Sequence, residues 1–359
     1  MKKAYLILDG GQVFEGYRFG AEGDAVGELV FNTGMVGYIE TLTDPSYCGQ
    51  IVLQTFPLIG NYGMADADYE AKTPTIGALI VREYNDEPSN FRSIETLSQV
   101  METYHIPGVW GIDTRKLTRS IRDRGSRKVL ITDASTSTEK GLAILRKREI
   151  PRDAVSRVSC DTMWISRAEP ETYHVVAIDC GIKQNILRSL QKRGCRVTVV
   201  PWNTPASTIE NLNPDGIFLS NGPGDPTDVP QTVASVKALL GRYPIFGICL
   251  GHQIISLAYG AKTYKLKFGH RGGNHPVRNL ETDKIEITSQ NHSYAVDADS
   301  LATTPLTVTH INLLDQTVEG VKCGKDRVFS VQYHPESAPG PQDSAYLFDH
   351  FVEMMDRCR

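Results

Sequence analysis

The second half of the chain alternates short apolar runs with amphipathic segments. Residues 174–180 (HVVAIDC) form a continuous apolar run, which is typical of a strand buried on both faces of a parallel sheet. Residues 182–194 then show helical spacing and end at a glycine. Strands that alternate with helices predict βαβ units, and hence an α/β fold with an open, mostly parallel sheet flanked by helices. The same rules predict further strands at 195–200, 216–220, 244–249, 284–290, 305–311 and 328–334, and further helices at 229–242, 250–260 and 344–355.

The first half has a different pattern, with short strands and turns before two helices. Residues 3–20 predict an opening β-hairpin with glycines at the bend, and 93–105 and 114–125 have helical spacing. Further strands are expected at 25–33, 50–57 and 75–81. We therefore expect a smaller α+β domain over residues 1–150, a connecting segment over 151–172, and the larger α/β domain over 173–359.

Composition and charge exclude several classes of protein. The chain has 359 residues and a formal net charge of −4, shared evenly between the halves, so we expect no nucleic-acid or membrane partner. The seven cysteines are scattered without a C-x-x-C pair, which argues against a disulfide framework or a zinc module. The opening apolar run is too short for a signal peptide, and no run reaches membrane-spanning length. These features favour a cytoplasmic location.

Candidate chemistry begins at Gly247-Ile248-Cys249-Leu250-Gly251, where an expected strand runs directly into an expected helix. The pattern G-x-C-x-G is the cysteine form of a nucleophile elbow, whose tight turn needs small residues two positions either side of the nucleophile. The N-terminus of the following helix would favour a thiolate, and the N–H of Leu250 would be available to an oxyanion. The structural alternative is a small buried cysteine at a tight turn.

A base for this cysteine is expected at the end of the run VFSVQYHPES. His334 and Glu336 lie two residues apart, so strand alternation would put both side chains on one face. Glu336 could then orient His334 and balance its charge, as the third group of a catalytic triad does. Taken alone, an H-x-E sequence is more often a histidine with a structural role.

A third element is the loop Leu219–Pro226 (LSNGPGDP), which follows an expected strand directly. Ligands of open α/β sheets bind at the carboxyl ends of the strands. Pro223 has no N–H, so the backbone donors in this loop would come from Gly222 and Gly224. Neither a G-x-x-x-x-G-K-[ST] nor a G-x-G-x-x-G phosphate motif is present.

In this order, SNGPGDP, GICLGHQ and HPE resemble the class I (triad) glutamine amidotransferase family, over about residues 173–359. Over nearly the whole chain, the sequence resembles the small, glutaminase subunit of carbamoyl-phosphate synthase. The segments that carry this second resemblance are GELVFNTGMVGYIETLTDPSY (27–47), QTFPLIGNYG (54–63), GIDTRKLTR (111–119), DCGIKQNILR (179–188) and FGHRGGNHPV (268–277).

The resemblance implies roles for the matching positions. Cys249 would attack the side-chain amide of L-glutamine to give a glutamyl thioester and ammonia, His334 would transfer the protons, and Glu336 would hold the imidazole. The positions that match glutamine-contacting residues of the family are Ser46, Gly222, Gly224, Leu250, Gln253, Asn291, Ser293 and Tyr294. Ser293 departs from the family, which often has glycine there, so a contact that needs a positive φ would be lost.

The same resemblance implies a partner. Ammonia would pass to a large synthetase subunit that uses ATP, Mg²⁺ and bicarbonate to make carbamoyl phosphate for arginine or pyrimidine biosynthesis, and no cofactor or metal is expected on this chain. We expect a heterodimer with that subunit and leave open a higher oligomer of the heterodimer. His270, His275, His292 and His310 lack a cysteine or carboxylate at ligand spacing, so we do not expect a metal site at these histidines. The basic run 115–128 suits a solvated helix face or a surface that docks onto the large subunit.

Three other functions remain open at this stage. A glutaminase that serves another synthetase would keep the second half of the chain, but the first half argues against it. A free-standing cysteine amidase or peptidase would use the same three residues without a partner. A regulatory module without activity is disfavoured because Cys249, His334 and Glu336 are all present.

Overall fold

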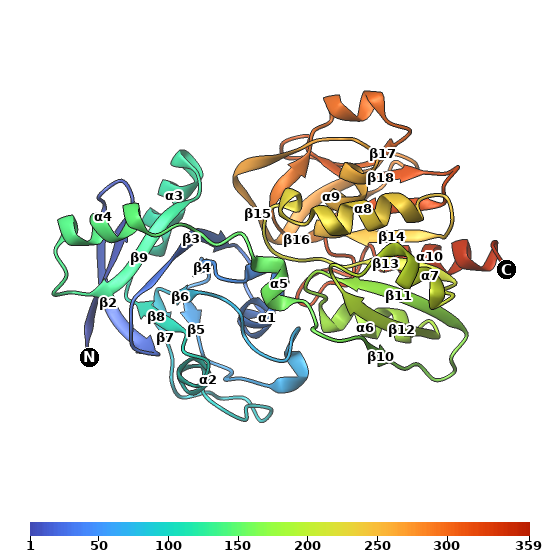
Figure 1. The fold of residues 1–359 in the computed structure, drawn as a ribbon. Helices are drawn as coiled ribbons and strands as arrows, with labels where there is room; N and C mark the ends of the chain where they lie inside the picture. Colours follow the sequence, from blue (N-terminus) through green and yellow to red (C-terminus); the bar gives the residue numbers. More distant parts are fainter. The chain divides into compact units, whose positions relative to one another are not determined.

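The computed structural model describes residues 1–359, and the chain divides into two compact units (Figure 1). The first unit comprises Met1–Pro151 and Lys267–Arg271, and the second comprises Arg152–Leu266 and Gly272–Arg359. The second unit has the expected α/β architecture, and the first is the smaller and mixes strands with short helices.

The first unit is built on a closed β-barrel. The expected opening hairpin is confirmed, because β1 and β2 pair antiparallel, with Lys3 opposite Tyr17. Parallel pairing joins β3 to β4, β4 to β6 and β6 to β8, and β9 closes the barrel between β3 and β1. The barrel order is β1 (Lys3–Leu8), β2 (Val13–Gly20), β8 (Pro107–Trp110), β6 (Ala78–Ile80), β4 (Ile51–Gln54), β3 (Ala25–Asn32) and β9 (Arg127–Asp133).

Helices pack on this barrel through residues of one face. Leu117 and Ile121 of α3 share a buried cluster with Ile51 and Leu53 of β4, while Val52, between them, belongs to a second cluster. This alternation is the period-two pattern of a strand whose two faces are both covered. The remaining elements of the unit are α1 (Tyr38–Thr43), α2 (Leu97–Thr103), α3 (Thr114–Arg124), α4 (Thr138–Lys147), the short pair β5 (Leu58–Ile59) and β7 (Glu83–Tyr84), and the 3₁₀ turns η1 (Pro45–Tyr47) and η2 (Asp66–Asp68).

The second unit is built on a ten-stranded sheet whose centre is parallel. Its order is β10 (Trp164–Ser166), β12 (Cys195–Pro201), β11 (Tyr173–Asp179), β13 (Gly216–Leu219), β14 (Ile245–Ile248), β19 (Val328–Val331), β18 (Val318–Cys323), β16 (Ile285–Val296), β15 (Thr263–Asn279) and β17 (Thr307–Asn312). The strands from β12 to β19 in this order run parallel. Antiparallel strands flank this parallel centre on both sides, because β10 pairs antiparallel with β12 and β18 pairs antiparallel with β19.

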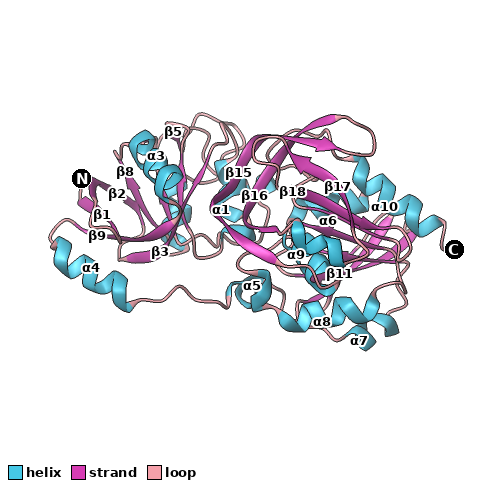
Figure 2. Cartoon of the chain, turned by 90° about the horizontal axis from the view of Figure 1, so that it is seen from above, coloured by secondary structure: helices cyan, strands magenta, loops and turns pink.

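Helices cover both faces of the parallel centre, as Figure 2 shows by colour. Val176 and Ile178 of β11 share one buried cluster with residues of α8 and α9, whereas Val175 and Ala177 share the other with residues of α6 and α10. The helices of this unit are α5 (Ala154–Val158), α6 (Gln184–Gln191), α7 (Ala206–Asn211), α8 (Pro230–Leu239), α9 (Leu250–Ala258) and α10 (Tyr346–Asp356), with 3₁₀ turns η3 (Pro226–Asp228) and η4 (Asp299–Thr303). None of the helices in the chain is both long and apolar enough to span a bilayer.

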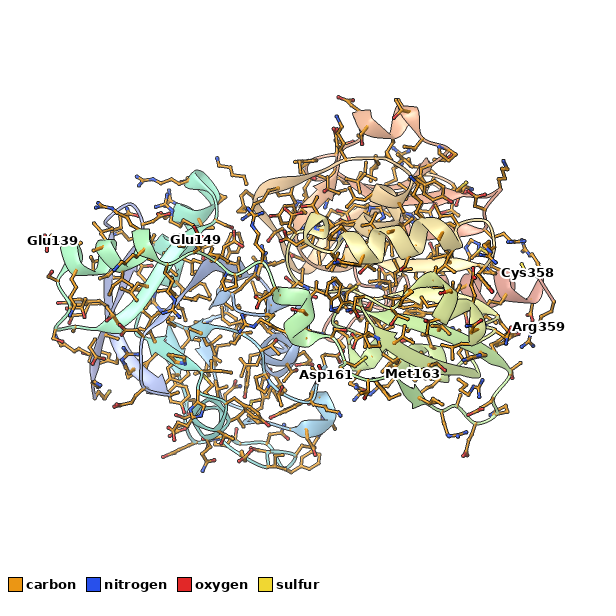
Figure 3. All side chains as sticks on the ribbon, viewed as in Figure 1. Glu139, Glu149, Asp161, Met163, Cys358 and Arg359 are labelled. Atoms are coloured by element: carbon orange, nitrogen blue, oxygen red, sulfur yellow. The ribbon has the colours of Figure 1, made fainter.

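Three details differ from the sequence-based expectations. Residues 151–172, expected to be a connecting segment, carry α5 and β10, and β10 extends the sheet of the second unit. The run 328–334, expected to be one strand, leaves the sheet after Val331. The seventeen-residue strand β15 was not expected, because the alternation of apolar and polar residues in its first part stops at the glycines and histidines that follow Phe268. Outside these three differences, the C-terminal residue Arg359 follows α10 (Figure 3), and its guanidinium group pairs with the carboxylate of Asp215 at 2.8 Å.

Candidate active site

Cys249 lies at the corner between β14 and α9, as the elbow pattern predicts. Its backbone has φ 56° and ψ −106°, a conformation that costs energy for any residue with a side chain. Both glycines of the pattern lie where other atoms of the chain come too close to leave room for a side chain. A Cβ on Gly247 would lie 2.6 Å from Ile255 Cδ1, and one on Gly251 would lie 2.4 Å from the carbonyl oxygen of Leu219. The strand therefore turns into the helix within one residue only because both positions lack a side chain.

The sulfur of Cys249 is buried at the N-terminus of α9. The residue is 2% exposed, and its thiol donates to the carbonyl of Asn291 on β16, with a separation of 3.6 Å between sulfur and oxygen. The backbone N–H of Cys249 donates to Val331 at the end of β19 (2.9 Å). The first N–H groups of a helix have no acceptor within the helix and carry the positive end of its dipole. A negative charge on the sulfur, or on an oxygen bound next to it, is favoured at this place.

His334 and Glu336 lie in the turn that follows β19, not on a strand as expected. The carbonyl of His334 accepts from the N–H of Ser337 (3.1 Å), which closes the turn, while the N–H of His334 donates to Ser289 (2.9 Å). The two side chains meet nevertheless: Nδ1 of His334 and Oε1 of Glu336 are 2.7 Å apart, and both residues are buried. The contact therefore arises from turn geometry and not from strand alternation.

The charges around His334 favour its imidazolium form. Burial by itself would lower the pKa of His334, but the charge of Glu336, its hydrogen bond to Nδ1 and the neighbouring Cys249 outweigh it and raise this pKa to about 10. Nδ1 is occupied by Glu336, so Nε2 is the nitrogen that faces the thiol. Burial would also raise the pKa of Glu336, but Lys183 and His334 lower it to about 2. The three side chains of Cys249, His334 and Glu336 thus form one buried, electrostatically linked set.

Lys183 is the participant that the sequence did not single out. Its ammonium group lies 3.0 Å from Oε1 of Glu336 and also donates to the carbonyls of Ser337 (2.9 Å) and Ala338 (3.2 Å). The residue is only 3% exposed, so an unpaired charge here would be costly. The lysine therefore fixes both the charge of Glu336 and the path of the turn. A lysine in the segment DCGIKQNILR just before a helix was the available signal, but its target depends on how a distant turn folds.

The glycine loop lies at the carboxyl end of β13, next to the elbow. A Cβ on Gly222 would lie 2.2 Å from the carbonyl oxygen of Cys180 and 2.8 Å from Leu250 Cδ2, and Gly224 has φ +88°. The loop is joined to the start of α6 because Oδ1 of Asn221 accepts from the N–H of Lys183 (3.2 Å). Leu250, the first residue of α9, is 1% exposed. The structure thus brings Gly222 and Leu250 together.

The predicted glutamine-contacting residues of α9 and β16 form a connected group. Nε2 of Gln253 donates to the carbonyl of Tyr294 (2.8 Å) and to Oε1 of Gln332 (2.9 Å), so this amide already supports β16. Gln332, fully buried, was not singled out from the sequence. Ser293 lies within β16 and is not among the non-glycine residues with positive φ, so replacement of a glycine causes no backbone strain there.

Ser46 belongs to the first unit, where it lies in η1. It is 6% exposed, and its N–H donates to the carboxylate of Asp44 (2.9 Å), which holds the 3₁₀ turn. Its contribution to a glutamine site stays a prediction.

Comparison with known proteins adds to this geometry. The family model for the class-I glutamine amidotransferase matches residues 176–354, and that for the carbamoyl-phosphate synthase small chain, CPSase domain, matches residues 6–131. A carbamoyl phosphate synthase small chain from Staphylococcus epidermidis is 51% identical over 99% of this chain and 96% of its own length. One from Oceanobacillus iheyensis is 52% identical over the same shares. The pyrimidine-specific small chain of Bacillus subtilis is 51% identical, again over 99% and 96%. The chain therefore belongs to the carbamoyl phosphate synthase small chain family and carries a class-I glutamine amidotransferase domain in its second half.

Proposed function

We propose that this chain is the glutamine-hydrolysing subunit of carbamoyl phosphate synthase and that Cys249, His334 and Glu336 perform the hydrolysis. The observation that carries the proposal is the buried set of these three side chains at the end of a parallel sheet, with the thiol at a strained strand-to-helix corner. Strain at a nucleophile and opposed pKa shifts on its neighbours are typical of catalytic sites. Membership of the family supports the choice of glutamine as the substrate.

In the first step the sulfur of Cys249 attacks the side-chain carbonyl carbon of L-glutamine. A C–S bond forms, the carbonyl oxygen gains negative charge, and the thiol proton resides on Nε2 of His334. Collapse of the tetrahedral intermediate breaks the C–N bond, and His334 gives its proton to the leaving nitrogen, so ammonia departs and a glutamyl thioester remains. Glu336 keeps the imidazole oriented through Nδ1 and balances its charge.

The developing oxyanion needs donors next to the sulfur. The N–H of Leu250 is in the first turn of α9 and has no acceptor within the helix, and the backbone of the Gly222–Gly224 segment lies against Leu250. We assign the oxyanion hole to these N–H groups. Contacts from Gln253, Asn291, Ser293 and Tyr294 would hold the rest of the glutamine.

In the second step His334 takes a proton from a water molecule whose oxygen attacks the thioester carbon, the C–S bond breaks, glutamate leaves, and the proton returns to the sulfur of Cys249. We propose that the ammonia is used by a large synthetase chain, which would bind ATP and Mg²⁺ and make carbamoyl phosphate from bicarbonate. Neither cofactor is proposed for this chain. The product would enter arginine or pyrimidine biosynthesis.

Glutamate release by the purified chain tests the proposal. The rate should be low for the chain alone, rise when the large chain, ATP and bicarbonate are added, and be lost in Cys249→Ser. Cys358→Ser is the matched control, because Cys358 is an exposed free cysteine near the chain's end (Figure 3). This control should keep the wild-type rate.

Two outcomes would contradict the proposal. A fast rate that ignores the large chain would indicate a free-standing cysteine amidase. Full activity in Cys249→Ser would remove the proposed nucleophile.

A further inference from the structure

A polar cleft of about 500 Å³ lies in the first unit, and none of the predicted site residues lines it. One wall is the polar face of α3, with Arg115, Arg119 and Arg122 spaced so that all three lie on one side of the helix. The opposite wall comes from the residues that follow the parallel strands β3 and β4. The threonines that line the cleft are Thr33, Thr55, Thr114 and Thr118, and no carboxylate or large apolar side chain lines it.

The positive charge of this cleft is not neutralised within the chain. Arg122 pairs with Asp123 at 3.0 Å, but the structure shows no ion pair or hydrogen bond for the guanidinium groups of Arg115 and Arg119. Both of these arginines are exposed. The hydroxyl of Thr118, buried beside them, also has no partner. The cleft therefore offers several unused donors to an anionic ligand.

The position of Arg115 in the first turn of α3 is also unfavourable for the helix itself. Arg115 and Lys116 lie in the first turn, which has no acidic residue, and the macrodipole makes this end positive. The capping carboxylate of Asp113 does not neutralise the positive charge of the cleft. It accepts a hydrogen bond from the N–H of Lys116 and is not among the residues that line the cleft. By contrast, α4 has Glu139 in its first turn and Arg146 and Lys147 in its last, the arrangement that stabilises a helix. Helix stability therefore accounts for the charges of α4 and for Arg122 and Arg124 in the last turn of α3, but not for Arg115 and Lys116 in its first turn.

We propose that this cleft, which we call the α3 cleft, docks an acidic segment of the large synthetase chain; the inference rests on the proposed function for the existence of that partner. Most small-molecule pockets are lined largely by apolar and aromatic groups, and the α3 cleft has none to hold a base or a sugar ring. Guanidinium groups bind carboxylates bidentately, and threonine hydroxyls can bind carboxylates or main-chain groups. The net charge of this chain is −4, so non-specific binding to a polyanion is not favoured elsewhere on it.

Assembly with the large chain of the same organism tests the proposal. We would measure the dissociation constant by calorimetry at low and at physiological salt for wild type and for the double variant Arg115→Gln/Arg119→Gln. The constant should rise about tenfold, the effect of losing two exposed charge pairs, and its salt dependence should become weaker. Arg146→Gln/Arg148→Gln removes the same charge from exposed arginines around the end of α4 and should leave the constant unchanged.

The readouts separate this proposal from the proposed function. Unassisted glutamate release by the isolated chain should be the same in wild type and in Arg115→Gln/Arg119→Gln, whereas stimulation by the large chain should require more of that chain. Wild-type affinity in this variant, or an equal loss in the α4 control, would overturn the docking proposal and leave the glutaminase proposal intact. Normal assembly combined with tighter binding of inorganic phosphate by wild type than by the variant would reassign the α3 cleft to a small anion. Absence of glutamate release in wild type would instead count against the proposed function.

Discussion

Two buried carboxylates in the second unit are held by different kinds of partner. Glu336, in the turn after β19, contacts the cationic groups of Lys183 and His334. Glu286, on β16, accepts from the hydroxyls of Ser344 (2.6 Å) and Tyr346 (2.8 Å), with Tyr333 at 3.4 Å. Both are nearly inaccessible to solvent. The charge of Glu336 acts directly on the imidazole of His334 beside Cys249. The hydroxyls around Glu286 instead satisfy its carboxylate with hydrogen bonds and join β16 to the start of α10.

A buried carboxylate can therefore serve either of two purposes in this fold. A carboxylate among cations holds a charge that a neighbouring group feels, so its removal should change chemistry more than structure. A carboxylate among hydroxyls holds elements together, so its removal should change stability more than chemistry. Substitutions of His334, Glu336, Lys183 and Glu286 test this division, and we expect the loss of turnover to decrease in that order.

His334→Asn should have the largest effect on turnover. The variant removes the proton carrier, and general acid–base catalysis contributes about 10²–10⁴-fold to rates. We expect glutamate release with the large chain to fall by about 10³-fold, while reaction of the free thiol of Cys249 with an alkylating reagent still occurs. Steady-state glutamate production measures the first effect. A loss of less than tenfold would remove His334 from the proposed mechanism.

Glu336→Gln should have the next largest effect, a fall of roughly 10–100-fold in kcat. The variant leaves the imidazole without its counter-charge while the ammonium of Lys183 stays nearby, so the pKa of His334 should fall from its raised value. The pH profile of glutamate release should therefore shift to lower pH. An unshifted profile would show that Glu336 does not charge-balance His334.

Unfolding of the same variant gives a separate pH test. The folded pKa of His334 is raised to about 10, so its contribution to stability is fully present below about pH 6.5 and is lost as the pH rises towards 10. The folded pKa of Glu336 is lowered to about 2, so its contribution is present above about pH 4.3 and is lost as the pH falls towards 2. The difference in unfolding free energy between wild type and Glu336→Gln should thus be greatest between about pH 4.3 and 6.5. Urea unfolding under reducing conditions at pH 6 and pH 9.5 measures it, and an equal difference at the two pH values would contradict the coupling.

Lys183→Met should have a smaller effect on turnover, about threefold to tenfold. The lysine acts on His334 only through Glu336, and methionine keeps the apolar stem while removing the charge. The pKa of Glu336 should rise, because one of the two cations that lower it is gone. The loss should therefore be greatest at acidic pH, and Lys183→Arg should recover part of the activity there. If the loss is equal at every pH and arginine recovers nothing, the lysine only holds the turn at Ser337 and Ala338.

The sequence was sufficient to predict that Cys249, His334 and Glu336 lie close together, but not the contacts that support them. Cys249 could be found because the elbow depends on glycines two residues away, and the structure shows that both are needed by close backbone approaches. His334 and Glu336 were predicted to meet on one face of a strand, whereas a turn brings them together. Lys183 and Gln332 were missed because their partners lie far along the chain, and no local pattern specifies such pairs.

The two units also differ in how far their folds could be predicted from the sequence. The parallel centre of the second unit is encoded by local apolar runs between helices, so most of its strands were predictable. The barrel of the first unit depends on distant pairings such as β2 with β8 and β3 with β9, which leave no periodic signal in the sequence. Strand β15 was unexpected because glycines and histidines interrupt it.

Glu286→Gln should have the smallest effect on turnover, less than twofold. The amide keeps the size of the carboxylate, and the hydroxyls of Ser344 and Tyr346 can turn to accept from its NH₂ group, so the cost in unfolding free energy should be about 1–2 kcal/mol. Glu286→Leu is the matched control, because it leaves the buried hydroxyls of Ser344 and Tyr333 without their acceptor and should cost about 3 kcal/mol or more, while the hydroxyl of Tyr346 keeps its hydrogen bond from Asn279. Urea unfolding and glutamate release on the same samples give both numbers. Tyr333 directly precedes His334, so a fall in kcat for Glu286→Gln as large as that for Glu336→Gln would show that the hydroxyl-bound carboxylate also positions the imidazole, and the division between the two sites would fail.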